Sequence, residues 1–182
     1  MSLKGTITTT DYLEFKPTVR KFKELVNNKD VFGLYGLISL YTGLRVGDIL
    51  KLKYEDVQGD TIQLAEEKTN KKRFITINEE IKEALKYFDG NGFIFKSQKK
   101  TVFTRQQINR KLKKLFIEFS ATHNISSHSL RKSFGRQVYN NDNQSERALM
   151  MLSEIFNHSS IATTRKYIGI RKEEISNVYL TL

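Results

Sequence analysis

Two arginines, two histidines and one tyrosine are the residues of this sequence whose types and spacing could do chemistry on a phosphodiester. Arg45 follows a Thr-Gly-Leu run at a predicted turn between helices, where a side chain can project into a cleft. His128 and Arg131 are three residues apart, a spacing that puts both on one face of a helix. His158 and Tyr167 flank a short segment that contains two threonines. Because arginine donates two hydrogen bonds to a phosphate and stays charged, these residues could stabilise the charge that develops on phosphoryl oxygens.

The sequence lacks the usual motifs for metal or nucleotide binding. It has no cysteine, no H-x-x-x-H or H-E-x-x-H pair, and neither of the Gly-rich phosphate-binding patterns. Its acidic residues come mainly as adjacent doublets, which diverge along a helix or strand, whereas a two-metal nuclease needs converging carboxylates. Unless distant carboxylates converge in the fold, we expect chemistry that uses fixed cations and no cofactor.

The charge balance favours a polyanionic partner. Thirty-one Lys and Arg against 20 Asp and Glu give a formal net charge of +11 and a pI near 9.7. Nucleic acid is the commonest polyanion in a cytoplasm, although a solvated lysine-rich surface would give the same charge. The longest uncharged stretch, residues 31–44, is shorter than the about 20 residues of a membrane helix, so it predicts a buried helix.

The apolar pattern predicts an α+β fold, mainly α-helical with a small three-stranded antiparallel sheet. The expected strands are residues 54–57, 61–64 and 74–77, with turn signals between them. The expected helices are residues 17–28, 30–44, 46–52, 79–88, 104–120, 129–139, 145–156, 161–168 and a last one from 171. Gly43 is placed to end the second helix and Asn78 to cap the fourth.

Three segments, in order, resemble the conserved boxes of the tyrosine recombinases, the phage integrase family. They are residues 42–50 (TGLRVGDIL), residues 128–134 (HSLRKSF), and residues 157–160 (NHSS) with Thr163, Thr164 and Tyr167. The corresponding family patterns are T-G-L-R-x-x-E, H-x-L-R-H-[ST]-F, and L-G-H-x-S followed by T-x-x-Y. Tyr167 comes nine residues after His158, as in the family, and the resemblance spans about residues 18–175.

The resemblance implies covalent DNA cleavage by a tyrosine. Tyr167 is implied to attack the scissile phosphate and to hold the 3′ end as a phosphotyrosine. Arg45 and Arg131 are implied to clamp the non-bridging oxygens, and His128 to assist proton transfer at the tyrosine. A phenol with a pKa near 10 is a poor nucleophile at neutral pH, so surrounding cations must favour its phenolate. His158 is implied to hydrogen-bond the phosphate.

A lysine completes the implied catalytic set, and three departures from the family patterns matter for the chemistry. Lys68, in the turn region of the sheet, is implied to protonate the departing 5′ oxygen, a role that Lys71 or Lys72 could also fill. Lys132 replaces the second histidine of H-x-L-R-H and keeps a donor there. Asn157 replaces a glycine, and asparagine tolerates a left-handed backbone. Asp48 replaces the commoner glutamate and is expected to brace Arg45.

The family also implies an organisation and a set of partners. Residues 17–182 are expected to form the catalytic domain after a leader or linker remnant at residues 1–16. We expect the N-terminal core-binding domain of full-length members to be absent, and the chain to be either an excised domain or a minimal member. Expected partners are double-stranded DNA, further copies of the chain in a tetramer on that DNA, and accessory DNA-bending proteins. No membrane partner is expected. The expected location is the bacterial cytoplasm, at the nucleoid when the protein acts. Ile175, Val178, Tyr179 and Leu182 could pack on their own domain or dock on a neighbouring subunit.

Two other functions remain open at this point. A type IB topoisomerase-like enzyme uses the same covalent tyrosine chemistry but relaxes supercoils as a monomer; the T-G-L-R box argues against it. A non-catalytic DNA-binding regulator would explain the charge, but not the order of arginines, histidines and tyrosine. The regulator would tolerate Tyr167→Phe, whereas a recombinase would lose cleavage and retain binding.

Overall fold

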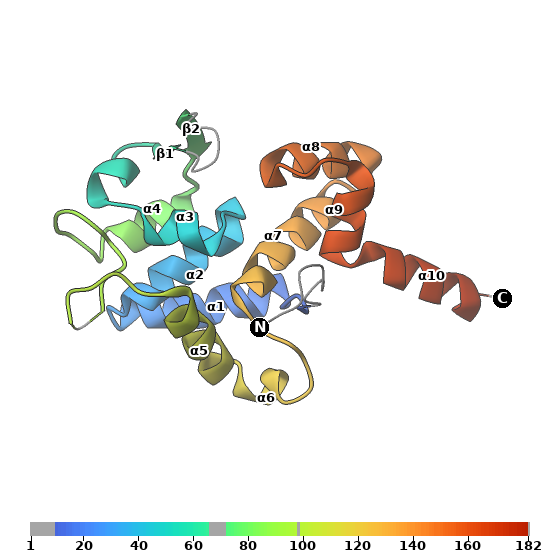
Figure 1. Cartoon of the computed structure of the whole chain (residues 1–182), viewed down its shortest axis with the longest axis horizontal. Coiled ribbons are helices and arrows are strands. Elements are labelled where there is room, and N and C mark those ends of the chain that lie inside the picture. Colours follow the sequence, from blue (N-terminus) through green and yellow to red (C-terminus); the bar gives the residue numbers. More distant parts are fainter. Residues whose placement is uncertain (1–9, 66–71, 98, 182) are drawn as a thin grey trace.

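The computed structural model describes residues 10–65, 72–97 and 99–181. Helices form most of it, and α7 runs between a larger group of elements and a smaller C-terminal group (Figure 1). The larger group contains α1 (Phe15–Asn27), α2 (Val31–Thr42), α3 (Val46–Leu50), η1 (Tyr54–Val57), β1 (Thr61–Ala65), β2 (Lys72–Thr76), α4 (Glu79–Leu85), α5 (Arg105–Leu115) and α6 (Ile117–Ser120). The smaller group follows α7 (Ser127–Asn141) and contains α8 (Glu146–Phe156), α9 (Ile161–Ile168) and α10 (Ile170–Leu180).

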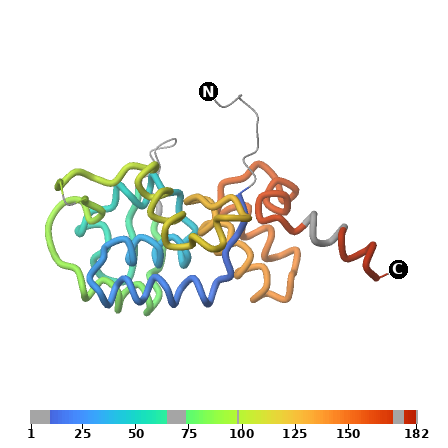
Figure 2. The backbone as a smooth tube through the Cα atoms, turned by 90° about the horizontal axis from the view of Figure 1, so that it is seen from below, coloured from blue at the N-terminus to red at the C-terminus, as the bar shows by residue number. Residues whose placement is uncertain are grey.

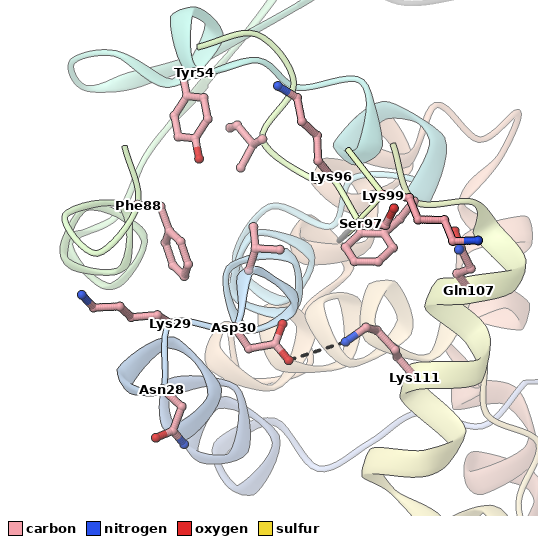
Figure 3. Close-up of a pocket in the computed structure, with 13 residues that line it drawn as sticks. Asn28, Lys29, Asp30, Tyr54, Phe88, Lys96, Ser97, Lys99, Gln107 and Lys111 are labelled. Atoms are coloured by element: carbon pink, nitrogen blue, oxygen red, sulfur yellow. Dashed lines mark ion pairs between the residues drawn. The ribbon is translucent and has the colours of Figure 1, made fainter. Parts of the chain in front are cut away.

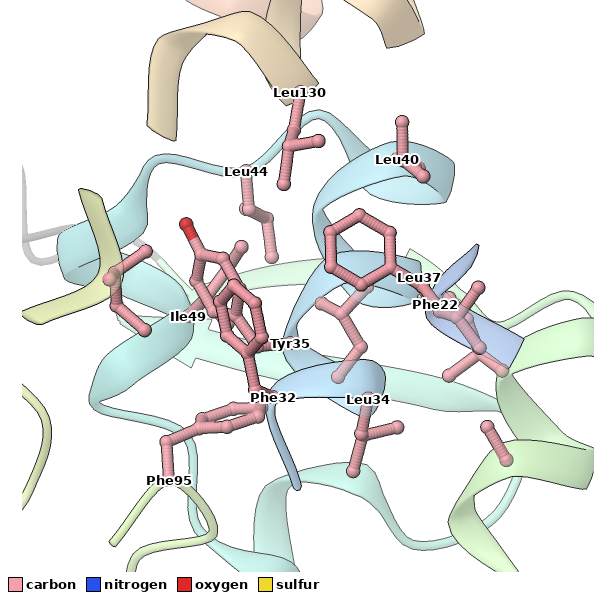
Figure 4. Packing of buried hydrophobic residues seen from close by; sticks show 14 of the residues in the cluster. Phe22, Phe32, Leu34, Tyr35, Leu37, Leu40, Leu44, Ile49, Phe95 and Leu130 are labelled. Atoms are coloured by element: carbon pink, nitrogen blue, oxygen red, sulfur yellow. The ribbon is translucent and has the colours of Figure 1, made fainter. Parts of the chain in front are cut away.

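Two clusters of buried apolar side chains meet along α7. The larger surrounds α2, which is buried on nearly all sides as its uncharged sequence predicts (Figure 4). The smaller joins α8 and α9 to the second half of α7. Leu130, near the start of α7, belongs to the larger cluster and Tyr139, near its end, to the smaller one. The helix therefore fixes the two groups relative to each other.

The sheet has two strands in the part of the chain that the structure describes. β1 and β2 are antiparallel, with Ile62 opposite Ile75. The strand predicted at residues 54–57 is wrong, because this segment is the 3-10 helix η1. Asp56 explains the difference: its Oδ2 accepts from the backbone N of Lys53 at 2.8 Å, and its own N donates to the Lys53 carbonyl at 3.0 Å. These bonds close a turn in place of a strand ladder.

Most of the predicted helix boundaries are confirmed within a few residues. Gly43 ends α2 with a left-handed φ of 62°, and Asn78 caps α4 by accepting from the N of Ile81 at 3.1 Å. The helix predicted at residues 104–120 is interrupted at Phe116, whose φ of −115° and ψ of 44° separate α5 from α6. At the C-terminal end, α10 contacts α9 and projects from the rest of the molecule (Figures 1 and 2).

No helix of the described residues is long and apolar enough to span a membrane.

Candidate active site

The five residues singled out for phosphodiester chemistry come from four places in the chain and meet beside α7. Arg45 lies at the N-terminus of α3, directly after the turn that ends α2. His128 and Arg131 lie in the first turns of α7. His158 follows the C-terminus of α8, and Tyr167 lies near the end of α9. The junction of the two apolar clusters is thus also the place where these side chains converge.

Both arginines are held by main-chain carbonyls. Arg131 is 4% exposed, and its guanidinium donates to the carbonyl of Gly43 and, at 3.1 Å, to that of Phe156. Arg45 is exposed and donates to the same Phe156 carbonyl at 3.0 Å. A buried arginine with hydrogen-bonded carbonyls on two separate segments has little freedom to move. Arg131 is therefore fixed, and Arg45 lies beside it on the shared Phe156 carbonyl.

The hydroxyl of Tyr167 lies among these cations. It is 3.4 Å from Nδ1 of His128, and the side chain also hydrogen-bonds Arg131. The ring packs edge-on against Phe156, with centroids 5.4 Å apart. Lys132 places its ammonium 5.5 Å from the ring centroid of Tyr167 and donates to the carbonyl of Thr10 at 2.6 Å. The phenol is thus oriented by a histidine, an arginine and a lysine.

His158 is oriented by a buried threonine of α9. Its Nδ1 lies 3.0 Å from the hydroxyl of Thr164, which is completely buried. The imidazole also packs against the ring of Tyr167, with centroids 5.1 Å apart. Because Thr164 engages Nδ1, Nε2 is the ring nitrogen left for a ligand.

Comparison with known proteins identifies the family. Residues 26–174 match the sequence model of the phage integrase family. The chain belongs to this family. The probable integrase/recombinase YoeC of Bacillus subtilis strain 168 is 34% identical over 176 residues, which are 92% of this chain and 92% of YoeC.

Two solved recombinases share the fold. The XerA recombinase superposes with a TM-score of 0.66 and 25% identity over 93% of this chain. The XerH site-specific recombinase, crystallised with its palindromic difH substrate after cleavage, gives a TM-score of 0.66 and 21% identity over 98% of this chain. The match spans 64% of the XerA chain and 56% of the XerH chain. The chain is thus a tyrosine recombinase with the fold of the catalytic domain, and its function is site-specific DNA recombination.

Positive charge and burial set the protonation of the recombinase's site. Burial, followed by the charges of Arg131 and Arg45, lowers the pKa of His158 to about 4. The pKa of His128 is lowered as well, first by desolvation and then by Arg131, Arg105, Lys132 and Arg45. Both imidazoles are therefore neutral at pH 7, and His128 can accept a proton.

The pKa of Tyr167 is raised because burial outweighs the favourable charges around it. Arg131, through its charge and a hydrogen bond, and Arg45 through its charge, act in the opposite direction. At neutral pH the phenol of this recombinase is protonated, so attack by this oxygen would require a base to take its proton. The neutral His128 ring, 3.4 Å away, is placed for that.

The other predicted site residues are less closely connected to the cluster. Asp48 and Arg45 are joined through the backbone, where the N of Asp48 donates to the carbonyl of Arg45 at 3.0 Å. Among the described residues these two side chains form no ion pair. Lys68, Lys71 and the side chain of Lys72 lie outside the described part of the recombinase. Among the described residues there is also no cluster of three or more His, Cys, Asp or Glu side chains that could hold a metal ion.

Sequence reasoning missed the acceptors that hold the arginines. Main-chain carbonyls, here those of Gly43 and Phe156, leave no mark in a residue pattern. The sequence pattern T-x-x-Y includes Thr164, but it does not predict the contact of Thr164 with His158. Asn109 was also missed: its Oδ1 accepts from the N of Ser127 at 2.9 Å and so ties α5 to the start of α7.

A separate pocket of about 800 Å³ lies near the opposite end of α2 and contains none of the described site residues (Figure 3). Two of its four lysines, Lys111 and Lys96, are engaged by the protein itself. Lys111 pairs with Asp30 at 3.5 Å and stands over the ring of Phe32 at 5.0 Å. Lys96 donates to the carbonyl of Asn91 at 3.1 Å. The candidate active site is the cluster beside α7, where the two arginines, two histidines and the tyrosine converge.

Proposed function

We propose that this recombinase cuts DNA at a specific site and rejoins it through a covalent 3′-phosphotyrosine at Tyr167. The observation that carries the proposal is the environment of one hydroxyl group. The Tyr167 oxygen lies 3.4 Å from Nδ1 of His128, and the same side chain hydrogen-bonds Arg131. A base and a fixed cation at a single phenol are what nucleophilic attack on a phosphate requires.

In the proposed cleavage step, the Tyr167 oxygen bonds to the scissile phosphorus while the bond to the 5′ oxygen breaks. His128 takes the phenol proton, and Lys68 gives a proton to the departing 5′ oxygen. Arg45 and Arg131 bind the non-bridging oxygens, whose charge is stabilised in the transition state. Rejoining reverses these transfers, with a 5′-hydroxyl attacking the phosphotyrosine. Because the tyrosyl ester conserves the phosphodiester bond energy, rejoining needs no ATP.

The remaining site residues support these steps in the proposal. His158 presents Nε2 to the phosphate and donates to it in the tautomer whose Nδ1 accepts from the Thr164 hydroxyl. Lys132 holds the ring of Tyr167 from one side. Asp48 braces the segment that carries Arg45. Each acts on the geometry or charge of the phosphate and its nucleophile.

The proposed substrate is double-stranded DNA, bound by a protein of net charge +11. XerH, which has the same fold, is bound to its own DNA substrate in a post-cleavage complex. We propose assembly into a tetramer on DNA, with α10 docking on a neighbouring subunit. Of the predicted docking face, Val178 and Tyr179 are 57% and 75% exposed on that projecting helix, whereas the side chain of Ile175 and all of Leu182 lie outside the described residues. The adjacent Leu180 is 80% exposed, and such exposure is unusual for apolar side chains. We further propose that the recombinase integrates or excises a mobile element at the bacterial nucleoid. DNA-bending proteins would assist this reaction.

A covalent trap tests the proposal. The wild-type chain and Tyr167→Phe are incubated with a pool of nicked duplexes of randomised sequence, and adducts are isolated on a denaturing gel and sequenced. Low salt is used because phosphate contacts weaken steeply as salt rises. We expect adducts from the wild type alone, converging on one sequence that both proteins bind in a gel-shift assay.

Two other results would contradict the proposal. Adducts without a common sequence, together with relaxation of supercoiled plasmid, would indicate a topoisomerase-like enzyme. Equal binding by both proteins without any adduct would indicate a non-catalytic DNA-binding protein.

A further inference from the structure

The C-terminus of α8 ends in a turn that leaves its last carbonyl, that of Phe156, without a helical partner. The N of His158 donates to the carbonyl of Ser153 at 2.9 Å, and the N of Asn157 to that of Glu154 at 3.0 Å. Asn157 adopts the left-handed conformation, with φ 51° and ψ 54°, that this double closure requires. The pattern satisfies two of the last helical carbonyls and leaves that of Phe156 available.

Both arginines of the site use this carbonyl. Arg45 donates to it at 3.0 Å and Arg131 at 3.1 Å. The C-terminus of a helix carries partial negative charge, which favours cations placed against it. The end of α8 therefore reduces the repulsion between two guanidinium groups that must stand close together.

The side chain of Phe156 contacts the same site from the other direction. It is completely buried, and its ring centroid lies 4.2 Å from Cζ of Arg131, within the range of a cation–π contact. The ring also packs against Tyr167 at 5.4 Å and His158 at 5.3 Å between centroids. One residue thus touches both arginines, the tyrosine and the histidine.

We propose that Phe156 is a positioning residue of the recombination reaction, whose carbonyl and ring together fix Arg45 and Arg131 relative to Tyr167. The L-G-H pattern of the family has leucine here, which could supply the carbonyl but no aromatic face. The ring is therefore the part of this device that the chain adds to the pattern. This inference rests on the proposed roles of the arginines and the tyrosine.

The first test measures, without DNA, whether the guanidinium of Arg131 lies over the ring of Phe156. A guanidinium above an aromatic ring has its proton resonances shifted upfield, and the signal of Arg131 can be assigned by its loss in Arg131→Lys. We expect Phe156→Leu to move this signal downfield. Leu152→Ala, which removes fully buried volume one turn earlier in the same helix, is the packing control and should leave the signal in place. An unchanged signal in Phe156→Leu would overturn the inference.

The second test measures cleavage on the duplex selected by the covalent trap. At saturating DNA we expect Phe156→Leu to form adduct roughly tenfold more slowly, the effect of losing one desolvated cation–π contact, with DNA affinity little changed. The pH at which cleavage becomes half-maximal should rise, because Arg131 favours the phenolate of Tyr167 and would stand less firmly beside it. Leu152→Ala should keep the wild-type pH midpoint of cleavage. If Phe156 contributed packing alone, the midpoint of Phe156→Leu would also stay at the wild-type value, which would contradict the inference.

Phe156→Tyr retains the aromatic face and provides a second variant if Phe156→Leu does not fold. It should cleave within about threefold of the wild type, because the cation–π contact is preserved. Equal losses in the tyrosine and leucine variants would show that only core volume matters and would overturn the inference. If the wild type itself forms no adduct, the proposed function fails, while the guanidinium shift still decides whether the ring of Phe156 stacks on Arg131.

Discussion

Arg45 and Arg131 share one acceptor, the carbonyl of Phe156, but they lie in different environments. Arg131 is 4% exposed and also donates to the carbonyl of Gly43, so it links the end of α2 to the end of α8. Arg45 is exposed, and the hydrogen bond to the carbonyl of Phe156 ties it to the end of α8. Two residues with the same proposed chemical role therefore differ in what they contribute to the fold.

Replacing each arginine by alanine should separate these contributions. Arg131→Ala leaves the buried Gly43 carbonyl without this donor, removes one of the two donors of the Phe156 carbonyl and vacates a buried position. It should lower the free energy of unfolding by about 2–4 kcal/mol. Arg45→Ala should cost less than about 1 kcal/mol, as for most exposed positions. Both variants should lose adduct formation. Urea denaturation gives the stabilities, and equal losses in the two variants would contradict the assignment of Arg131 as the link.

The groups that carry charge or nucleophilicity could be predicted from the sequence, because their types and order are themselves the signal. The structure brings five of these residues together beside α7, namely Arg45, His128, Arg131, His158 and Tyr167. Helix boundaries were also predictable where a side chain or a glycine makes the cap, as at Asn78 and Gly43.

The arrangement around those groups could not be predicted. The bond from Arg131 to the Gly43 carbonyl joins residues 88 positions apart, and its acceptor is an atom that every residue has. The wrong prediction of a strand at residues 54–57 has a local cause and not a long-range one. There a local bond from Lys53 to the carboxylate of Asp56 decided the conformation against the apolar pattern.

Acid should weaken the fold through His158. Its pKa is lowered to about 4, whereas an unfolded histidine titrates near 6.5, so between these values the unfolded chain binds more protons. The stabilisation is fully present above about pH 6.5 and is lost as the pH falls towards 4. His158→Asn should therefore lose less stability than the wild type between pH 7 and pH 4.5 in chemical denaturation. Parallel losses in the two proteins over this window would contradict the prediction.

Gly43 should tolerate no side chain, because the turn after α2 is both left-handed and crowded. Its φ is 62°, and a Cβ atom at this position would collide with the ring of Phe134. Gly59→Ala is the matched control, since Gly59 has a φ of 78° and open space around its Cα. The control should cost about 1 kcal/mol for the strained backbone alone. Gly43→Ala should cost clearly more and should also slow cleavage, because the Gly43 carbonyl holds Arg131.

The proposed general acid can be identified by changing the leaving group. If Lys68 protonates the 5′ oxygen, Lys68→Gln should slow cleavage of ordinary DNA by roughly 100-fold or more, the usual contribution of a general acid. A substrate with sulfur at the 5′ bridging position should restore the rate, because a thiolate is a far more stable leaving group than an alkoxide and needs no proton. Adduct formation on matched oxygen and sulfur substrates provides the measurement.

Lys71→Gln and Lys72→Gln are the matched controls for this prediction, since they remove the same charge from the same region of the chain. Both should cleave the oxygen substrate at nearly the wild-type rate and gain nothing specific from sulfur. If the sulfur substrate rescues Lys71→Gln or Lys72→Gln instead, the proton donor is that lysine and the assignment to Lys68 is wrong. If it rescues none of the three variants, the 5′ oxygen receives its proton from outside this segment.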